Sequence, residues 1–219
     1  MQKKFSFFCS WSGGKDSALA LYNVIQMGGE PKFLLNMLRE DGKRSRSHGL
    51  TFDTLQKQAQ ALGIPLLTRS TSWDDYEAHF ISALEELKKK GIEVGVFGDI
   101  DIEEHREWVE RVCSYVKIKP LLPLWKKTRI ELLKELLDLG FKATIIVVKD
   151  DKLSKNFLGR TLNKEVIAEL EKVGIDLSGE SGEYHTIVTA GPIFSHPINL
   201  NKKKVSSHNG YSFLDISVL

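Results

Sequence analysis

The sequence predicts an α/β fold with a parallel sheet covered by helices, followed by a smaller C-terminal α+β domain. In residues 1–119, short apolar stretches alternate with amphipathic segments across short connections, a pattern typical of a parallel sheet. A glycine-rich turn at Ser12–Ser17 separates the first apolar stretch from the first amphipathic segment. After Pro120, the strands become shorter and are punctuated by Gly-Pro and Asn-Gly turns.

The first part of the chain is expected to hold four strands and four helices. One helix carries a stripe of Tyr76, Phe80, Leu84 and Leu87, and three lysines and Gly91 suit its C-terminus. Another has an apolar face that includes Cys113, which is therefore expected in the core. We expect strands near 4–10, 32–38, 64–69 and 93–98, and helices near 16–27, 51–62, 74–90 and 102–116.

The Pro-bracketed extended segment Pro120–Trp125 is interpreted as the passage into the second domain. Beyond it we expect a helix near 128–139, a strand at 142–149 and a helix near 161–173, capped by Thr161 or Asn163. Asn209-Gly210 predicts a two-residue hairpin that leads into a strand at 211–218. The predicted domains are therefore residues 1–119 and residues 120–219.

Composition excludes several classes of protein. The formal net charge of +2 over 219 residues argues against a nucleic-acid-binding or membrane-binding surface. Cys9 and Cys113 form no C-x-x-C pair, which argues against zinc and against a disulfide framework. No apolar stretch approaches the ~18 residues of a membrane span, and Met1–Lys4 lead into a strand rather than a secretory signal. A reducing cytoplasm fits these observations best.

The turn Ser12-Gly13-Gly14-Lys15-Asp16-Ser17 predicts a phosphate site. Its glycines let the backbone point N–H groups outward, and the helix that follows adds roughly half a positive charge. The turn differs from the G-x-x-x-x-G-K-[ST] motif because Asp16, not Ser or Thr, follows the lysine. Lys15 would neutralise phosphate charge, the serines would donate hydroxyls, and Asp16 could hold Mg²⁺ or organise the turn. The expected nucleotide contacts here are Ser10, Ser12, Gly13, Gly14, Lys15, Asp16 and Ser17.

Ligands of an open parallel sheet lie beyond the carboxyl ends of its strands, so residues there are further candidates. Gly98 and Asp99 follow the fourth strand, and the next helix opens with His105 and Arg106. Asp99 and Asp101 could cap that helix or bind a metal, and Arg106 could grip a phosphate or a carboxylate. After the second strand, backbone groups around Met37 are expected to bind adenine, and His48 is close enough in sequence to contact a ligand.

A third polar segment runs from Gly179 to Thr186 and carries Glu180 and Glu183 with an aromatic residue and an imidazole. Such a segment is either a solvated turn or a functional loop. The expected substrate contacts are His48, His105, Arg106, Gly182, Tyr184, His185 and Thr186.

Together these segments resemble the diphthine-ammonia ligase family, a branch of the PP-loop ATP pyrophosphatases. Its members carry S-G-G-K-D-S near the N-terminus, G-D-I or G-A-I after the fourth strand, and E-G-G-E-[FY]-E-[TS] in the second domain. The resemblance extends from Phe5 to about Phe194. It implies a Rossmann-like sheet of the adenine nucleotide alpha hydrolase type, with helices on both faces, that binds ATP.

The resemblance also implies the reaction, in which the carboxylate of diphthine on elongation factor 2 is adenylated by ATP and then amidated by ammonium. ATP and Mg²⁺ are the implied cofactors, elongation factor 2 is the implied transient partner, and a homo-oligomer is compatible with the sequence. Lys15, Asp16, Glu180 and Glu183 are the expected catalytic residues. The glutamates could hold ammonium, and one could take its proton.

Two positions depart from the family pattern, and they leave the substrate open. Ser181 stands where a glycine is usual, and His185 replaces a glutamate. Related PP-loop proteins linked to cobalamin salvage carry a histidine there, so a corrinoid carboxylate is the alternative substrate. A tRNA-modifying enzyme would need a sulfur-handling cysteine pair or a broad basic surface, and the chain has neither. A non-catalytic ATP sensor would lack a second domain, whereas residues 120–219 of this chain are long enough to form one.

Overall fold

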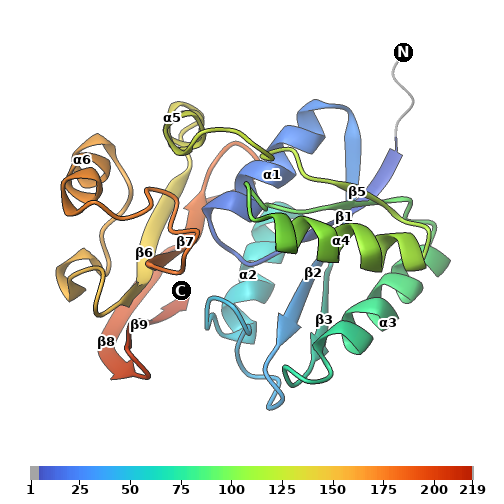
Figure 1. The fold of residues 1–219 in the computed structure, drawn as a ribbon, viewed down its shortest axis with the longest axis horizontal. Helices are drawn as coiled ribbons and strands as arrows, with labels where there is room; N and C mark the ends of the chain where they lie inside the picture. The colour runs from blue at the N-terminus through green and yellow to red at the C-terminus, as the bar shows by residue number, and fades with distance from the viewer. Residues whose placement is uncertain (1–4, 219) are drawn as a thin grey trace. The chain divides into compact units, whose positions relative to one another are not determined.

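The computed structural model describes residues 5–218, which form two compact units (Figure 1). Unit 1 holds residues 5–12 and 16–126, and unit 2 holds Gly13–Lys15 together with residues 127–218. Residues 1–4 lie outside the described residues; they include the first residue of the strand expected at 4–10 and the segment Met1–Lys4 that is expected to lead into it. The domain boundary at residues 119 and 120 stays a prediction.

Unit 1 is built on five parallel strands in the order β3-β2-β1-β4-β5, which confirms the predicted parallel α/β fold. This order places later strands on both sides of β1, as in Rossmann-type sheets. The strands are β1 (Phe5–Ser10), β2 (Gly29–Leu38), β3 (Leu66–Ser70), β4 (Val94–Val96) and β5 (Lys119–Leu121).

Strand β5 was not predicted. Pro120 and Leu121 belong to the predicted extended passage, but Lys119–Leu121 pair with β4, with Val94 opposite Lys119 and Val96 opposite Leu121. The strand has only three residues and contains Pro120, and proline within sheets is confined to edges and strand ends. A short edge strand with a proline has no alternating pattern that sequence inspection could detect.

The helices of unit 1 follow the predicted positions closely. Helices α3 and α4 pack on the sheet face that carries Phe8, Leu35 and Met37, and Cys113 lies in this core as predicted. The strand order runs one way across the sheet from β1 to β3 and the other way from β3 to β5. Because crossovers between parallel strands are right-handed, the helices of the first part, α1 and α2, cover the face opposite to α3 and α4. The helices are α1 (Lys15–Gln26), α2 (Phe52–Leu62), α3 (Tyr76–Lys89) and α4 (Glu103–Tyr115).

Unit 2 contains a four-stranded antiparallel sheet in the order β7-β6-β9-β8, which confirms the second α+β region. Positive φ angles of 52° at Asn209 and 77° at Gly210 form the predicted hairpin turn between β8 and β9. The elements are α5 (Arg129–Asp138), β6 (Lys142–Lys149), the short 3₁₀ helix η1 (Lys155–Phe157), α6 (Lys164–Val173), β7 (Tyr184–Ala190), β8 (Leu200–His208) and β9 (Tyr211–Val218).

Two helix starts in unit 2 are fixed by side-chain caps. Asn163 accepts a hydrogen bond from the Val166 amide at 2.8 Å, so α6 begins at Lys164 rather than at residue 161. Thr128 and Glu131 form a reciprocal capping box at the start of α5. In the part of the chain that the structure describes, no helix combines the length and hydropathy needed to cross a membrane.

We predict that Thr128→Ala lowers the free energy of unfolding by about 1 kcal/mol, because the Glu131 amide loses its acceptor. Thr128→Ser keeps the hydroxyl and serves as the control. Urea unfolding of both variants measures the difference. Equal losses in the two variants would show that the cap does not contribute to stability.

Candidate functional site

The glycine-rich turn follows β1 and opens α1, as the sequence predicts. Gly13 has a φ of 82°, a conformation that favours glycine, and α1 begins two residues later at Lys15. The hydroxyls of Ser12 and Ser17 are hydrogen-bonded to each other at 3.1 Å within unit 1. Two hydroxyl groups therefore lie together at the start of a helix, where an anion is favoured.

In unit 2, residues Gly13–Lys15 hydrogen-bond to β7 and to the segment that precedes it. The Val188 amide donates to the Gly13 carbonyl at 2.9 Å, and the Lys15 amide donates to Thr186 Oγ1 at 3.1 Å. The Lys15 ammonium donates to the Ser178 carbonyl and lies 5.3 Å from the centre of the Tyr184 ring. Only 5% of Lys15 is exposed, so its charge is held in a largely desolvated place.

The segment before β7 is organised by Asp176, which sequence analysis did not single out. One oxygen of Asp176 accepts the amides of Ser178 at 2.8 Å and Glu180 at 3.4 Å, and the other accepts Arg129 Nε at 2.9 Å. Tyr184 adds a hydrogen bond from its hydroxyl to the Leu177 carbonyl at 2.6 Å. The position of Asp176, an acidic residue just before a glycine-rich turn, could have indicated that its side chain binds the amides of that turn. Its contact with Arg129 could not be predicted, because Arg129 lies far away in the sequence.

The two predicted glutamates lie in this same segment. Glu183 is 7% exposed and accepts the Ser181 amide at 3.0 Å, and Glu180 is half-buried. The buried hydroxyl of Ser178 has no hydrogen-bond partner in the described structure. A buried carboxylate close in the chain to an unpaired hydroxyl is consistent with a ligand site, because buried polar groups are normally paired.

The predicted substrate residues of β7 fall on two faces of the strand. Tyr184 and Thr186 are buried and are engaged by the Leu177 carbonyl and the Lys15 amide. His185 is half-buried and, by the alternation of a strand, points to the opposite face. Gly182 has a φ of 78° and lies in the turn before β7. The roles of these residues in substrate binding stay predictions.

The segment after β4 brings Gly98 against the glycine-rich turn Ser12–Ser17. A Cβ atom at Gly98 would lie 2.9 Å from the Asp16 carbonyl carbon and 3.0 Å from the Ser17 nitrogen, so only glycine fits. Asp99 lies 3.3 Å from Nδ1 of His105. The structure therefore brings Gly98 next to Asp16 and Ser17, and pairs Asp99 with His105.

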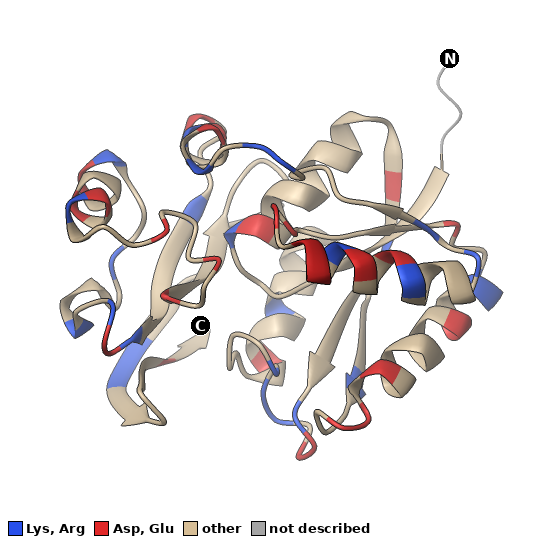
Figure 2. Ribbon diagram, viewed as in Figure 1, with Lys and Arg blue, Asp and Glu red and all other residues tan. Residues whose placement is uncertain are grey.

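Arg106 lies on the exposed side of α4 and pairs with acidic residues of its own helix. Its Nε donates to Glu110 at 2.7 Å, and its guanidinium lies 5.3 Å from the centre of the Trp125 ring. Figure 2 shows acidic and basic residues interspersed along α4, so the helix presents no surface of a single sign. A ligand role for Arg106 stays a prediction.

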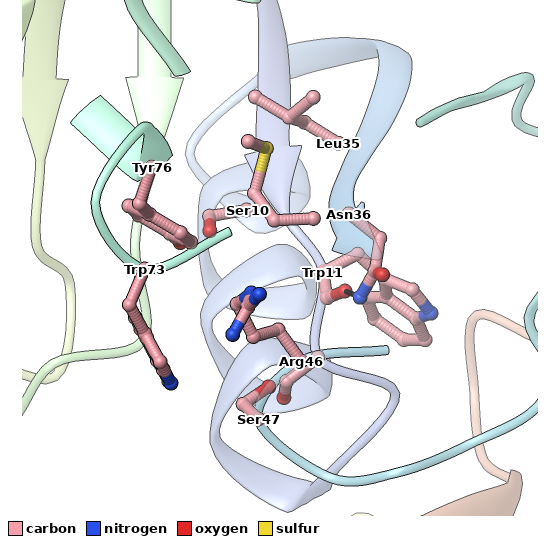
Figure 3. Close-up of a pocket in the computed structure, with 10 residues that line it drawn as sticks. Ser10, Trp11, Leu35, Asn36, Arg46, Ser47, Trp73 and Tyr76 are labelled. Atoms are coloured by element: carbon pink, nitrogen blue, oxygen red, sulfur yellow. Dashed lines mark hydrogen bonds between the residues drawn. The ribbon is translucent and has the colours of Figure 1, made fainter. Parts of the chain in front are cut away.

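Unit 1 also contains a pocket of about 80 Å³ at the carboxyl ends of β1, β2 and β3 (Figure 3). Arg46 donates from Nε to the Thr71 carbonyl at 3.1 Å, and its guanidinium lies 4.6 Å from the centre of the Trp73 ring. Burial and the charge of Asp99 raise the pKa of Tyr76 to about 12, against the opposing effect of Arg46. The lining residues are Ser10, Trp11, Ser12, Leu35, Asn36, Met37, Arg46, Ser47, Trp73 and Tyr76.

The pocket includes three residues predicted as nucleotide contacts, Ser10, Ser12 and Met37. His48 is half-buried and is not part of the lining. Sequence analysis did not identify Asn36 or Trp73. A polar residue within the apolar strand β2 and a tryptophan just after β3 were the signals that could have indicated them.

Among residues 5–218, no three His, Cys, Asp or Glu side chains gather as they would around a metal ion. Both cysteines are free and buried. Burial raises the pKa of the Cys9 thiol and raises that of Cys113 to about 12, so neither is activated as a thiolate.

The strand order of unit 1, with a glycine-rich turn after the central strand and a pocket at the carboxyl ends, defines a Rossmann-type α/β protein. Two family models match this chain, the diphthamide synthase N-terminal domain over residues 7–120 and the C-terminal domain over residues 128–218. The chain belongs to the diphthamide synthase family.

Curated relatives agree with this membership. The mouse diphthine-ammonia ligase is 29% identical over 95% of this chain and 87% of its own length, and the human one is 28% identical over the same shares. The ligase of Schizosaccharomyces pombe is 28% identical over 90% of this chain, which spans 36% of that protein. A solved structure described as a predicted subunit of a tRNA methyltransferase from Methanocaldococcus jannaschii aligns with 85% of this chain and 97% of that chain, with a TM-score of 0.47 and 15% identity.

We predict that Asp176→Ala accelerates hydrogen exchange at the amides of Ser178 and Glu180 by roughly tenfold, because both lose their acceptor. Asp176→Asn keeps one carbonyl oxygen and should have a smaller effect. Exchange measured by NMR compares the two variants with the parent. Unchanged protection in Asp176→Ala would mean that other contacts hold this segment.

Proposed function

We propose that this protein is an ATP-dependent amide ligase that adenylates a carboxylate, releases pyrophosphate and transfers ammonia to the acyl group, leaving AMP. The proposed substrate is diphthine on elongation factor 2, since the curated relatives carry the name diphthine-ammonia ligase. The proposed place of action is the cytoplasm, where two unpaired cysteines remain reduced.

One observation carries the proposal: the lysine of the phosphate turn contacts the segment that bears the two glutamates. Lys15 donates to the Ser178 carbonyl, and Glu180 and Glu183 follow within five residues. A phosphate-binding cation and two carboxylates therefore belong to one part of unit 2. An enzyme that joins an activated carboxylate to ammonia needs both kinds of group in one place.

In the first step, a carboxylate oxygen of the substrate attacks the α-phosphorus of ATP. The bond from that phosphorus to the oxygen bridging to the β-phosphate breaks, and pyrophosphate leaves. The Lys15 ammonium, which donates to the Ser178 carbonyl, carries the positive charge of the glycine-rich turn. Lys15, the hydroxyls of Ser12 and Ser17 and the start of α1 would stabilise the negative charge that develops on the departing group.

In the second step, the nitrogen of ammonia attacks the acyl carbon, the acyl carbon–oxygen bond breaks, and AMP leaves. Ammonium must lose a proton before it can attack. Glu180 and Glu183 would attract ammonium by charge, and one of them would take that proton. Glu183 is the better placed to act in a water-poor site because it is buried and held by the Ser181 amide.

Mg²⁺ fits this site as an ion that arrives with ATP. Such ions are commonly held by one or two carboxylates together with substrate phosphates rather than by a protein cage. Asp16, at the phosphate turn, is the proposed carboxylate. When bound, the ion neutralises phosphate charge.

We predict that the protein, incubated with ATP, Mg²⁺, ammonium and diphthine-bearing elongation factor 2, forms AMP, pyrophosphate and amidated factor. Lys15→Ala should lower the rate by about 100-fold or more, because one charge-stabilising group is lost. Lys203→Ala, at an exposed position of β8, is the matched control. No AMP above background with any carboxylate would refute the ligase function, and AMP formed only with a corrinoid carboxylate would reassign the substrate.

We also predict that Glu183→Gln lowers the rate of amide formation by about 100-fold while the affinity for ATP stays nearly unchanged. Glu165→Gln, an exposed change in the first turn of α6, is its control. Single-turnover kinetics and calorimetric titration with ATP separate the two effects. A matching loss of ATP affinity would instead assign Glu183 to the nucleotide.

A further inference from the structure

The pocket at the ends of β1, β2 and β3 contains one buried polar atom with no partner. Asn36 is 4% exposed, and its Nδ2 donates to the Trp11 carbonyl at 2.6 Å. Its Oδ1 makes no hydrogen bond in the described structure. Figure 3 shows the Asn36 carboxamide beside Trp11 among the residues that line the pocket.

The orientation of this carboxamide is fixed by its neighbour. If the amide were flipped, Oδ1 would lie against the Trp11 carbonyl, and two acceptors would face each other. The unpartnered atom of Asn36, a residue that lines the pocket, is therefore an acceptor rather than a donor. Since an unpaired buried acceptor destabilises a protein, its presence in a pocket indicates a ligand that brings a donor.

Other acceptors nearby are already engaged. The Met37 carbonyl accepts the Arg46 amide at 2.9 Å, the Leu35 carbonyl accepts the Trp11 amide at 2.8 Å, and the Leu38 carbonyl accepts the Thr71 amide at 3.1 Å. The carboxyl end of β2 thus presents Asn36 Oδ1 as its unpaired buried acceptor in the described structure. The aromatic rings of Trp73 and Tyr76, 5.6 Å apart, add flat apolar surface to the same pocket.

We infer that Asn36 Oδ1 accepts a hydrogen bond from the 6-amino group of adenine and so selects ATP against nucleotides with a 6-oxo group. This inference rests on the proposed use of ATP. Guanine and hypoxanthine carry an oxygen at the 6-position, which would face Oδ1 as a second acceptor. At about 80 Å³, the pocket holds one edge of a base rather than a whole nucleotide.

Three nucleotides test the inference on the unaltered protein by calorimetry: ATP, the triphosphate of purine riboside, which has hydrogen at the 6-position, and inosine triphosphate. We expect the purine riboside triphosphate to bind roughly tenfold more weakly than ATP, and inosine triphosphate more weakly still. Equal affinity for ATP and the purine riboside triphosphate would overturn the inference and would indicate that Oδ1 binds only water.

Asn36→Leu should reduce the affinity for ATP to that for the purine riboside triphosphate, so that the ratio of the two falls toward one. Asn201→Leu, the same change at an exposed position of β8, should keep the ratio of the unaltered protein. The nucleotide series on the unaltered protein decides the question even if Asn36→Leu does not fold. AMP formation without discrimination among the three nucleotides would overturn the role of Asn36 alone, whereas no binding of ATP would overturn the proposed function as well.

Discussion

The candidate site depends on the hydrogen bonds that Gly13 and Lys15 make to Val188, Thr186 and the Ser178 carbonyl. Burial of an ammonium group is costly unless polar partners replace water. Here a carbonyl and the face of Tyr184 do so, and the carbonyl belongs to a segment that Asp176 holds through the Ser178 amide. The position of the lysine therefore depends on Asp176, which acts on it through Ser178. Glu180 and Glu183 belong to the same segment, so their positions depend on Asp176 as well.

A second constraint comes from the alternation of side chains in β2. Leu35 and Met37 pack against α3 and α4, so Asn36 between them must point to the other face of the sheet. A polar residue there is tolerated because Trp11, just after β1, offers a carbonyl for its amide nitrogen. The core thus fixes the direction of the Asn36 carboxamide, whose Oδ1 has no hydrogen-bond partner in the described structure. The proposed recognition of a nucleobase would therefore depend on the same strand that supports the core.

The sequence predicts what periodicity and glycine chemistry encode. The parallel sheet, its four long helices and the Asn209-Gly210 hairpin are confirmed because each rests on a local pattern. Strand β5 was missed because three residues around Pro120 show no pattern, and η1 is equally short. At the site, Gly98 could be predicted from its place after β4, whereas Arg129 and Asp176 are brought together across 47 positions by tertiary packing alone. Trp73 and Arg46 likewise meet only in the fold.

The two departures from the diphthine-ammonia ligase pattern affect the molecule differently. Ser181 replaces a glycine, but it is not among the non-glycine residues with positive φ, so serine fits there without strain, unlike Gly179 and Gly182 on either side. His185 lies in β7 on the face opposite Tyr184 and Thr186, the residues that contact Lys15. A change at position 185 can therefore alter what that face binds while the lysine contacts persist. In the proposed function, adenylation and substrate choice would therefore depend on different faces of β7, with His185 on the face opposite Tyr184 and Thr186.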